Sequence, residues 1–446
     1  MPSALFRILL LLLSVSVIAA CSHKSPVTPA RPAYNGPGEI ADIRSHPQDL
    51  NAYVGSNPQR RIIDMSSQSA QAARWRSKFF SPWHQDTPSV RKSEVSSMLN
   101  SRARGWKNGS EKWNEAEPNW ALMRANAAIQ SFPNMTAAAI TTHATDVREM
   151  PTHTPRYSKP TPDPMQNTFD YFQYTRLPMG QPVLICHRSQ DGAWYYVETP
   201  LVSGWVDAKD VATVSPAFEA SWEGSRLGAI VREHVPLNGS EAYIGTVLPM
   251  VSTSSVYVPV AGSDGSASPR AVPVPDGTVN TMPIAMTPAN FARLGNQILG
   301  QHYGWGGMLG LRDCSAMTRD LMTPFGIWLP RNSRSQGRVG YPTSLAGMSS
   351  AEKEATLQRS GVPFATLVVM NGHVVLYIGT YEGRPAIMHD LWGIRVDEPA
   401  DEDQRLIIGR AVITTLTPGA EVPNLHNGRT IGESFHTMTV LGNAHK

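Results

Sequence analysis

Apolar residues in the C-terminal part of the chain recur with the three- and four-residue spacing of amphipathic helices. Thr287-Pro288 supplies an N-cap and a first-turn proline, an apolar stripe follows, and Gly300 is a C-cap, so a helix is predicted over 287–300. A second stripe predicts a buried helix that begins near Cys314 and ends at Gly326. Its apolar positions are Met317, Leu321, Met322 and Phe325.

The middle of the chain has a different pattern, with short strands separated by turn residues. Val183-Leu184-Ile185 is a buried-strand run, and Asp191-Gly192 marks a hairpin turn. The stretch DGAWYYVETPLVSGWVDAKDV, residues 191–211, resembles a bacterial SH3-like domain. We therefore expect one small SH3-like barrel over 133–215 and a second, less regular one over 216–265.

The first twenty residues have the pattern of an export signal. After Arg7, the stretch from Ile8 to Ala20 carries no charge. As a helix it would span about 20 Å, short of the ~30 Å hydrocarbon core of a membrane, so residues 1–20 are predicted to be a signal peptide.

Cys21 follows directly after this segment. Ile18-Ala19-Ala20-Cys21 resembles the bacterial lipobox, in which the cysteine thiol takes a lipid; ordinary cleavage beside an incidental cysteine is the alternative. By the same resemblance, Ser22 favours the outer membrane if the host has one. The proline-rich residues 21–38 are expected to form a tether that reaches on the order of 50 Å from the membrane.

Two other segments complete the predicted domain organisation. Residues 39–132 look mostly helical, with a helix start at Thr87-Pro88, and they contain five tryptophans. These aromatic residues either form a sugar-binding surface or fill gaps between domains, and packing is favoured. Residues 266–286 are rich in Gly, Ser and Pro and are expected to be a linker to a C-terminal domain over 287–446.

The charge balance excludes one class of function. The chain has 39 Lys and Arg against 36 Asp and Glu, and charged residues make up only 17% of it. A nucleic-acid-binding protein held by a dense basic field is therefore not expected. Three cysteines are too few for a disulfide scaffold, and the buried-strand context of Cys186 predicts an inert thiol.

Cys314 and two histidines form the candidate catalytic site. A thiol in the first turn of a helix lies beside unpaired amides and partial positive charge, which favour the thiolate. The glycines before it would let the backbone approach a substrate closely. His373 begins one predicted strand and His389 ends the next. A three-residue turn, with Thr380 opposite Arg384, would place both rings on one face, so an odd loop or a bulge is predicted.

This set of residues suits nucleophilic catalysis. Cys314 would attack an acyl carbon, and His373 would accept the thiol proton or hold it as an imidazolium, then pass it to the leaving amine. His389 would fix the tautomer of His373. Alternatively, Cys314 is a core residue and each histidine a satisfied structural group. Zinc ligation is disfavoured because the spacing lacks a short ligand pair, and no metal or other cofactor is expected.

The longer motif resembles the NlpC/P60 family of papain-like bacterial cell-wall cysteine peptidases. The matching residues lie within 287–416: Tyr303-Gly304-Trp305-Gly306-Gly307, Asp313-Cys314-Ser315, Gly326-Ile327-Trp328-Leu329-Pro330-Arg331 and Gly372-His373-Val374. The upstream order resembles a subgroup with a helical stabilising segment and two SH3-like domains. Ala316 departs from the glycine that many relatives have after Cys-Ser. The fold class is therefore expected to be multidomain α+β with a papain-like C-terminal domain.

The resemblance implies the activity and the roles of the site residues. It implies a γ-D-glutamyl-L-diamino acid endopeptidase acting on peptidoglycan stem peptides, with Cys314, His373 and His389 as catalytic triad. Tyr303 would assist the oxyanion, and Asp313 and Ser315 would contact the L-Ala end, although Asp313 also suits an N-cap. The first SH3-like domain would border the cleft and select a free N-terminal L-Ala. Tyr171 or the Trp194-Tyr195-Tyr196 run would line it, unless they only pack the strand core.

Two other functions remain open at this point. The protein is either a lipid-anchored enzyme in contact with the membrane, or a non-catalytic peptidoglycan-binding lipoprotein that works through its SH3-like domains. A papain-like amidase or acyltransferase acting on another acyl donor is the third possibility. Retention of Cys314, His373 and His389 weighs against the non-catalytic alternative.

Overall fold

The computed structural model describes residues 39–99, 105–107, 111–113, 118–160, 169–397 and 405–444. The predicted signal peptide, Cys21 and the proline-rich tether lie outside the described residues. Residues 38–446 form one compact unit. No helix within the described ranges is long and apolar enough to cross a membrane.

The N-terminal segment is helical, as expected. Its helices are α1 (Ala41–Ser45), α2 (Met65–Phe79), α3 (Lys92–Leu99) and α4 (Pro118–Asn126). The helix start predicted at Thr87-Pro88 is wrong, because the Ser89 hydroxyl and the Val90 amide are bonded to the Glu198 carboxylate at 2.6 and 2.8 Å. These bonds hold the segment as a loop against the first sheet. Four of the five tryptophans are buried, which supports their packing role: Trp75, Trp83, Trp113 and Trp120.

The first β-rich region is a seven-stranded sheet with the order β3-β2-β6-β5-β4-β1-β7. Its strands are β1 (Ala137–Thr141), β2 (Thr145–Arg148), β3 (Gln173–Leu177), β4 (Pro182–Arg188), β5 (Trp194–Glu198), β6 (Ser203–Asp207) and β7 (Val211–Thr213). The predicted hairpin at Asp191-Gly192 joins β4 to β5, and Gly192 takes the positive φ of 72° that such a turn requires. Cys186 is fully buried in β4, and its burial raises the pKa of the thiol.

The second β-rich region follows α5 (Pro216–Gly224). It consists of a five-stranded sheet, β13-β12-β11-β8-β14, and the separate hairpin β9-β10. The strands are β8 (Leu227–Ile230), β9 (Val235–Leu237), β10 (Ser240–Ala242), β11 (Val247–Ser252), β12 (Ser255–Ala261), β13 (Ala267–Pro273) and β14 (Val279–Thr281).

The linker predicted over 266–286 is therefore wrong for about half of its length. Ala267–Pro273 pairs with β12 through seven residues, and Val279–Thr281 pairs with β8. The prolines that suggested a linker are tolerated because β13 is an edge strand, where a missing N–H costs no ladder hydrogen bond.

The C-terminal domain has a six-stranded antiparallel sheet with the order β15-β20-β16-β17-β18-β19. The strands are β15 (Tyr341–Ser344), β16 (Thr366–Met370), β17 (His373–Tyr381), β18 (Arg384–Arg395), β19 (Arg405–Thr414) and β20 (Thr437–Val440). The helices are α6 (Pro288–Gly295), α7 (Cys314–Met322), α8 (Ser333–Gln336) and α9 (Ser350–Ser360). Helix α6 ends before the predicted Gly300, whereas Thr287 caps it as expected.

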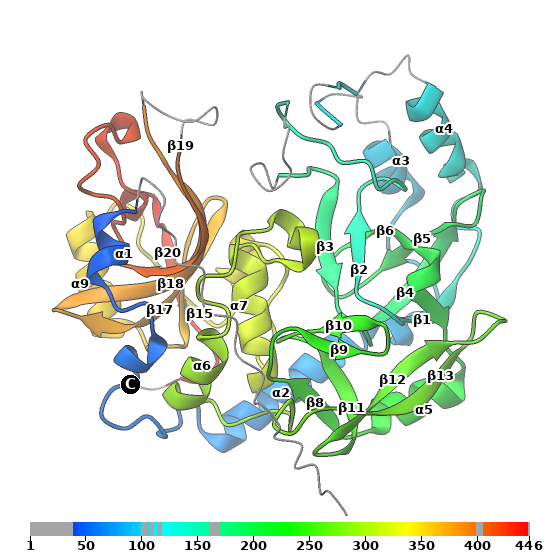
Figure 1. Ribbon diagram of the computed structural model, residues 1–446, viewed down its shortest axis with the longest axis horizontal. Coiled ribbons are helices and arrows are strands. Elements are labelled where there is room, and N and C mark those ends of the chain that lie inside the picture. Colours follow the sequence, from blue (N-terminus) through cyan, green and yellow to red (C-terminus); the bar gives the residue numbers. More distant parts are fainter. Residues whose placement is uncertain are drawn as a thin grey trace, which may run out of the picture. The chain divides into compact units, whose positions relative to one another are not determined.

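Helix α7 lies between the C-terminal sheet and β3 of the first sheet (Figure 1). Its predicted apolar stripe is buried against one face of β17 and β18. Helix α1 covers part of the other face, where Ile40 and Ile43 pack on Leu391 and Val412. The molecule is thus mixed α+β, with an N-terminal helical segment, a β-rich middle and a C-terminal domain built around α7.

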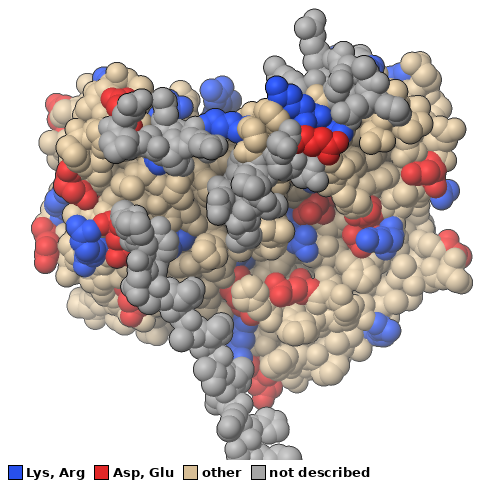
Figure 2. All heavy atoms as spheres, turned by 45° about the horizontal axis from the view of Figure 1, so that its top comes forward, with Lys and Arg blue, Asp and Glu red and all other residues tan. Residues whose placement is uncertain are grey.

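Surface charge on the face shown in Figure 2 is mixed. Basic and acidic side chains lie singly or in small groups on a surface that is mostly uncharged. The described residues on that face therefore form no dense basic field, in keeping with the near balance of charges in the sequence.

Candidate active site

Cys314 is the first residue of α7, as its sequence context predicted. The side chain is 5% exposed and belongs to the core cluster that α7 forms with β17 and β18. The backbone N–H of Val374 lies against the thiol and acts to lower its pKa. Because Val374 follows His373 directly, the sulfur is close to the start of the strand that carries the first histidine.

His373 and His389 are hydrogen-bonded to one another. Nε2 of His373 lies 3.0 Å from Nδ1 of His389, and the ring centroids are 5.2 Å apart. The second nitrogen of His389, Nε2, lies 3.0 Å from the Thr414 hydroxyl on β19. His389 is completely buried, whereas His373 is partly exposed. The structure therefore brings together the two rings that the sequence paired.

The turn between the two strands differs from the predicted one. It has two residues, Glu382 and Gly383, because Tyr381 pairs with Arg384. A bulge lies between Tyr377 and Gly379, and it shifts the register by one residue. A two-residue turn alone would place the histidines on opposite faces, and the bulge compensates for it. The prediction of an odd loop or a bulge is confirmed, but the three-residue turn is wrong.

No hydrogen bond joins the Cys314 thiol to either imidazole in the described residues. Nε2 of His373 is used by His389, so Nδ1 is the ring nitrogen left to accept a thiol proton. Hydrogen bonds between catalytic groups are often long in a site without substrate and shorten when the substrate binds.

The amides at the start of α7 are not unpaired, contrary to the sequence-based expectation. Oδ1 of Asp313 accepts from the backbone N–H groups of Ser315 and Ala316 at 3.1 and 2.9 Å. Burial, and next the Asp313 charge, raise the pKa of Cys314 to about 12. Burial also lowers the pKa of His373 to about 4. Both shifts favour the neutral forms of the thiol and the imidazole, so we expect proton transfer to accompany attack.

A cavity of about 660 Å³ opens beside His373. Tyr303 lines it together with three other aromatic residues, Phe169, Trp305 and Trp392. The Tyr303 ring lies 5.9 Å from that of Phe169 and 5.7 Å from that of Trp392. Burial, and next Cys314, raise the pKa of Tyr303 well above its usual value, so its phenol stays protonated and can donate a hydrogen bond.

The first β-rich region contributes a different residue to the cavity wall from those that were predicted. Phe169, in the segment before β3, lines the cavity. Tyr171 is 41% exposed and lies beside Trp305, with 6.2 Å between the ring centroids, but it does not line the cavity. Trp194 and Tyr196 pack in the core of the first sheet, so for these two the packing alternative holds.

Three family models match the chain. The NLPC_P60 stabilising domain matches residues 10–132, the SH3 domain of the SH3b1 type matches 155–207, and the NlpC/P60 family matches 300–401. The last match spans Cys314, His373 and His389. The C-terminal domain is an NlpC/P60 domain. The expected family resemblance and the order of its domains are confirmed, while the second SH3-like unit stays a prediction.

Three solved structures are similar to the chain, and the first of them shows the same fold. An NlpC/P60 endopeptidase from Photobacterium damselae subsp. piscicida has a TM-score of 0.78 and 22% identity, covering 90% of this chain and 98% of that chain. An NlpC/P60 family protein from Bacillus cereus ATCC 10987 has a TM-score of 0.44 and 19% identity, covering 68% and 99%. NlpC2 from Trichomonas vaginalis has a TM-score of 0.28 and 12% identity, covering 69% and 98%. No curated protein matches the chain significantly.

Asp313 and Ser315 of the NlpC/P60 domain are both buried and bonded within the protein. The Asp313 carboxylate accepts from Arg331 at 2.5 and 3.1 Å and from the Gly306 amide at 3.1 Å. Ser315 donates its hydroxyl proton to Asp313 at 2.9 Å and accepts from Arg331 at 2.8 Å. Asp313 is therefore an N-cap, as one alternative held, and the partner of a buried arginine.

The glycines before Cys314 allow a close backbone contact, but with the first sheet and not with a substrate as predicted. A Cβ atom on Gly306 would lie 2.6 Å from the Gln173 carbonyl, and one on Gly307 would lie 2.7 Å from the Arg176 side chain. Both glycines have positive φ, 64° and 84°. They let the loop of the NlpC/P60 domain lie directly on β3, so the close approach is to the first sheet.

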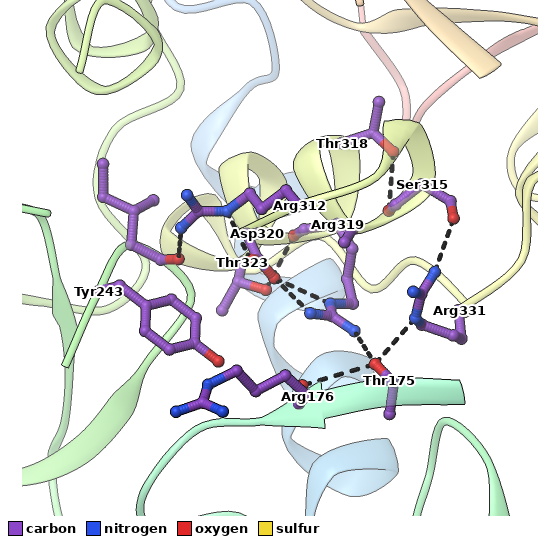
Figure 3. Close-up of polar contacts among 12 residues, drawn as sticks. Thr175, Arg176, Tyr243, Arg312, Ser315, Thr318, Arg319, Asp320, Thr323 and Arg331 are labelled. Carbon is purple, nitrogen blue, oxygen red and sulfur yellow. Dashed lines mark hydrogen bonds and ion pairs between the residues drawn. The ribbon is translucent and has the colours of Figure 1, made fainter. Parts of the chain in front are cut away.

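A buried charge network joins α7 to both β-rich regions, and the sequence reasoning missed it (Figure 3). Arg312 bonds to Asp320 at 2.8 Å and to Glu233 at 2.8 and 3.0 Å. The Thr175 hydroxyl of β3 accepts from Arg331 at 2.8 Å and from Arg319 at 3.4 Å. Adjacent opposite charges at Arg312-Asp313 and Arg319-Asp320, within an otherwise apolar stretch, were the available signal. The network fixes α7, and with it Cys314, against the neighbouring sheets.

The described residues contain no group of three or more His, Cys, Asp or Glu side chains placed to hold a metal ion. Among these residues, the imidazoles of the candidate site bond only to one another and to the Thr414 hydroxyl. The chemistry that this arrangement offers is that of a thiol and a base.

Proposed function

We propose that the protein is a cell-wall cysteine endopeptidase that cleaves the bond between the γ-carboxyl of D-Glu and the diamino acid in peptidoglycan stem peptides. The NlpC/P60 domain indicates a peptidoglycan-hydrolysing cysteine endopeptidase. The bond and the preference for a free N-terminal L-Ala are the finer parts of the proposal. The observation that carries it is the hydrogen-bonded pair His373–His389 beside a cysteine at the start of a buried helix.

The reaction begins with both partners neutral. As the Cys314 sulfur attacks the γ-carbonyl carbon, its proton passes to Nδ1 of His373, and the imidazolium that forms is held by His389. The Tyr303 hydroxyl donates a hydrogen bond to the oxyanion of the tetrahedral intermediate.

The intermediate then collapses and the amide bond breaks. His373 gives its proton to the leaving amine of the diamino acid, and a thioester between Cys314 and the γ-acyl group remains. Water attacks this thioester with His373 as base, which releases the acid and regenerates the thiol.

The L-Ala end is assigned to the side of the site where Asp313 and Ser315 lie. This assignment rests on the family resemblance, because the Asp313 oxygens already accept from α7 and Arg331 and the Ser315 hydroxyl already accepts from Arg331. Phe169 lines the cavity from outside the NlpC/P60 domain, which supports a cleft that accepts short peptides.

For the location, we propose export and lipid anchoring through Cys21, with residues 21–38 as tether to the bacterial membrane, the outer membrane if the host has one. The motif Ile18-Ala19-Ala20-Cys21 supports this proposal. Metabolic labelling with a fatty-acid analogue should label the wild-type protein, and Cys21→Ser should abolish the label.

The activity is tested on defined peptides of the form L-Ala-γ-D-Glu-diamino acid-D-Ala, with a free or an acetylated N-terminus. We expect the wild type to release L-Ala-γ-D-Glu from the free peptide, detected by mass spectrometry, and Cys314→Ala to release none. Equal cleavage of the acetylated peptide would refute the N-terminal preference. Binding of peptidoglycan without cleavage would favour the non-catalytic lipoprotein, and transfer of the acyl group to an added amine would favour the acyltransferase.

A further inference from the structure

The two histidines are part of a longer hydrogen-bond chain that continues into β19. The Thr414 hydroxyl lies 2.8 Å from the Thr415 carbonyl oxygen and 3.0 Å from Nε2 of His389. A hydroxyl group has one proton, and a carbonyl oxygen can only accept. The Thr414 proton therefore points to the Thr415 carbonyl, and the Thr414 oxygen accepts from an Nε2–H group of His389.

This assignment determines the tautomers of both rings. Neutral His389 with its proton on Nε2 has a lone pair on Nδ1, which accepts from Nε2–H of His373 at 3.0 Å. Neutral His373 with its proton on Nε2 has its lone pair on Nδ1. That nitrogen is the one that makes no bond to His389 and remains for the Cys314 proton.

We propose that Thr414 is a positioning residue that sets the tautomer of His389 and, through it, keeps Nδ1 of His373 unprotonated as the base for Cys314. Without the hydroxyl, His389 has no acceptor at Nε2 and can move its proton to Nδ1. It then donates to His373, whose proton moves to Nδ1, where it blocks transfer from the thiol. The proposal rests on the proposed function in one respect, that Cys314 is the nucleophile and His373 its base.

The N-terminal segment holds this chain in place. The backbone N–H and the hydroxyl of Thr415 both donate to Asp42 of α1, at 2.8 and 2.6 Å. Asp42 therefore holds Thr415, the residue whose carbonyl oxygen accepts from the Thr414 hydroxyl. Glu39 lies in the same segment and pairs with Arg410 at 2.9 Å, without a bond to Thr415. It provides a matched control for the effect of Asp42.

Thr414→Val removes the hydroxyl and keeps the shape, while Thr414→Ser keeps the hydroxyl. Thr439→Val is the control, because Thr439 is an equally buried threonine of the same sheet whose hydroxyl donates to the Val339 carbonyl. Nitrogen-15 NMR of histidine-labelled full-length protein reports which ring nitrogens carry protons. The rate of Cys314 alkylation by iodoacetamide between pH 5 and 9 reports the base without requiring a peptide substrate.

We expect His373 in the wild type to be protonated at Nε2 and bare at Nδ1, and Thr414→Val to reverse this. Alkylation and peptide kcat should fall at least tenfold in Thr414→Val, with KM changed less than twofold, and the loss should shrink as pH rises. Thr414→Ser and Thr439→Val should behave as wild type. Asp42→Ala should lose about threefold to tenfold and Glu39→Ala nothing.

A wild-type His373 protonated at Nδ1 would overturn the proposal, as would equal losses in Thr414→Val and Thr414→Ser. If Thr414→Val does not fold, the proposal is tested by the tautomer of the wild type and by the alkylation rates of Thr414→Ser and Asp42→Ala. Failure of the wild type to cleave stem peptides would refute the proposed function alone, because the tautomer and alkylation measurements do not depend on the peptide.

Discussion

Two guanidinium nitrogens of Arg331 donate hydrogen bonds to the carboxylate of Asp313, at 2.5 and 3.1 Å. Asp313 directly precedes the buried Cys314 in the chain. Burial raises the pKa of Asp313, but Arg331 and the amides of α7 outweigh burial, and the pKa is lowered overall. The pair thus keeps a negative charge at the start of the catalytic helix. The Asp313 carboxylate caps the helix, and its charge makes the Cys314 thiol less acidic.

Arg331→Met should leave the Asp313 charge buried without its partner. We expect the free energy of unfolding at pH 7 to fall by about 3–5 kcal/mol, measured by urea denaturation. Because the folded-state pKa of Asp313 is lowered, the pair stabilises above the unfolded-state pKa and loses this effect as pH falls below it. The difference between variant and wild type should therefore shrink below pH 4.

The exposed pair Arg91–Glu94, with side chains 78% and 44% exposed, is the control for this change. Arg91→Met should cost at most about 1 kcal/mol. A loss in Arg331→Met no larger than that of the control would show that Asp313 does not depend on Arg331.

Asp390 follows His389 in β18 and is 1% exposed, and its Oδ1 atom has no hydrogen-bond partner among the described residues. Burial, and next the charge of Asp313, raise its pKa well above the usual value. A raised folded-state pKa destabilises the fold at pH values above the unfolded-state pKa. Asp390→Asn should therefore raise the melting temperature at pH 7, and the gain should disappear below about pH 4.

The exposed Asp397 offers a comparison, since its side chain is 60% exposed and pairs with His426. Asp397→Asn should leave the melting temperature within about 1 °C of wild type. If Asp390→Asn melts at or below the wild-type temperature at pH 7, Asp390 is a stabilising ionised group and the account of its burial is wrong.

The protonation states of the free site can be measured directly. With the pKa of Cys314 raised to about 12 and that of His373 lowered to about 4, we expect no thiolate at Cys314 from pH 5 to 9. The ultraviolet difference spectrum between wild type and Cys314→Ser should then show no thiolate absorbance near 240 nm. A thiolate signal at pH 5 would instead indicate a preformed ion pair with His373.

The two histidines should differ in how much activity depends on them. His373→Ala removes the base and should lower kcat/KM by at least about 10³-fold, whereas His389→Ala removes an orienting partner and should cost about 10–100-fold. His84→Ala, at a surface site 56% exposed, is the control and should have no effect. Equal losses at His373 and His389 would mean that both rings take part in proton transfer.

The sequence predicted the parts of the site that depend on local pattern. Thr287 and the apolar stripe after Cys314 located α6 and α7, because capping and helical periodicity are properties of a few consecutive residues. The common face of His373 and His389 was predicted, with an odd loop or a bulge to produce it, but the position of the bulge between Tyr377 and Gly379 was not. A bulge depends on the pairing of two strands, which one strand's sequence does not specify.

The longer-range partners could not be predicted from sequence. Thr414 lies 25 residues from His389 and meets it only because β19 pairs with β18. The β13 strand looked like a linker because its prolines carry a loop signal, and only its place at the sheet edge permits them. The expectation of unpaired amides at Cys314 was wrong because the preceding Asp313 occupies them.

An electrophilic peptide tests the central claim most directly: L-Ala-γ-D-Glu with a chloromethyl ketone in place of the scissile amide. Peptide mapping by mass spectrometry should find one adduct, on Cys314, formed at least about 100-fold more slowly in His373→Ala. Cys186, fully buried in the first sheet, should remain unmodified in the same sample. No adduct on Cys314, or an equal rate in His373→Ala, would contradict a thiol nucleophile served by this histidine.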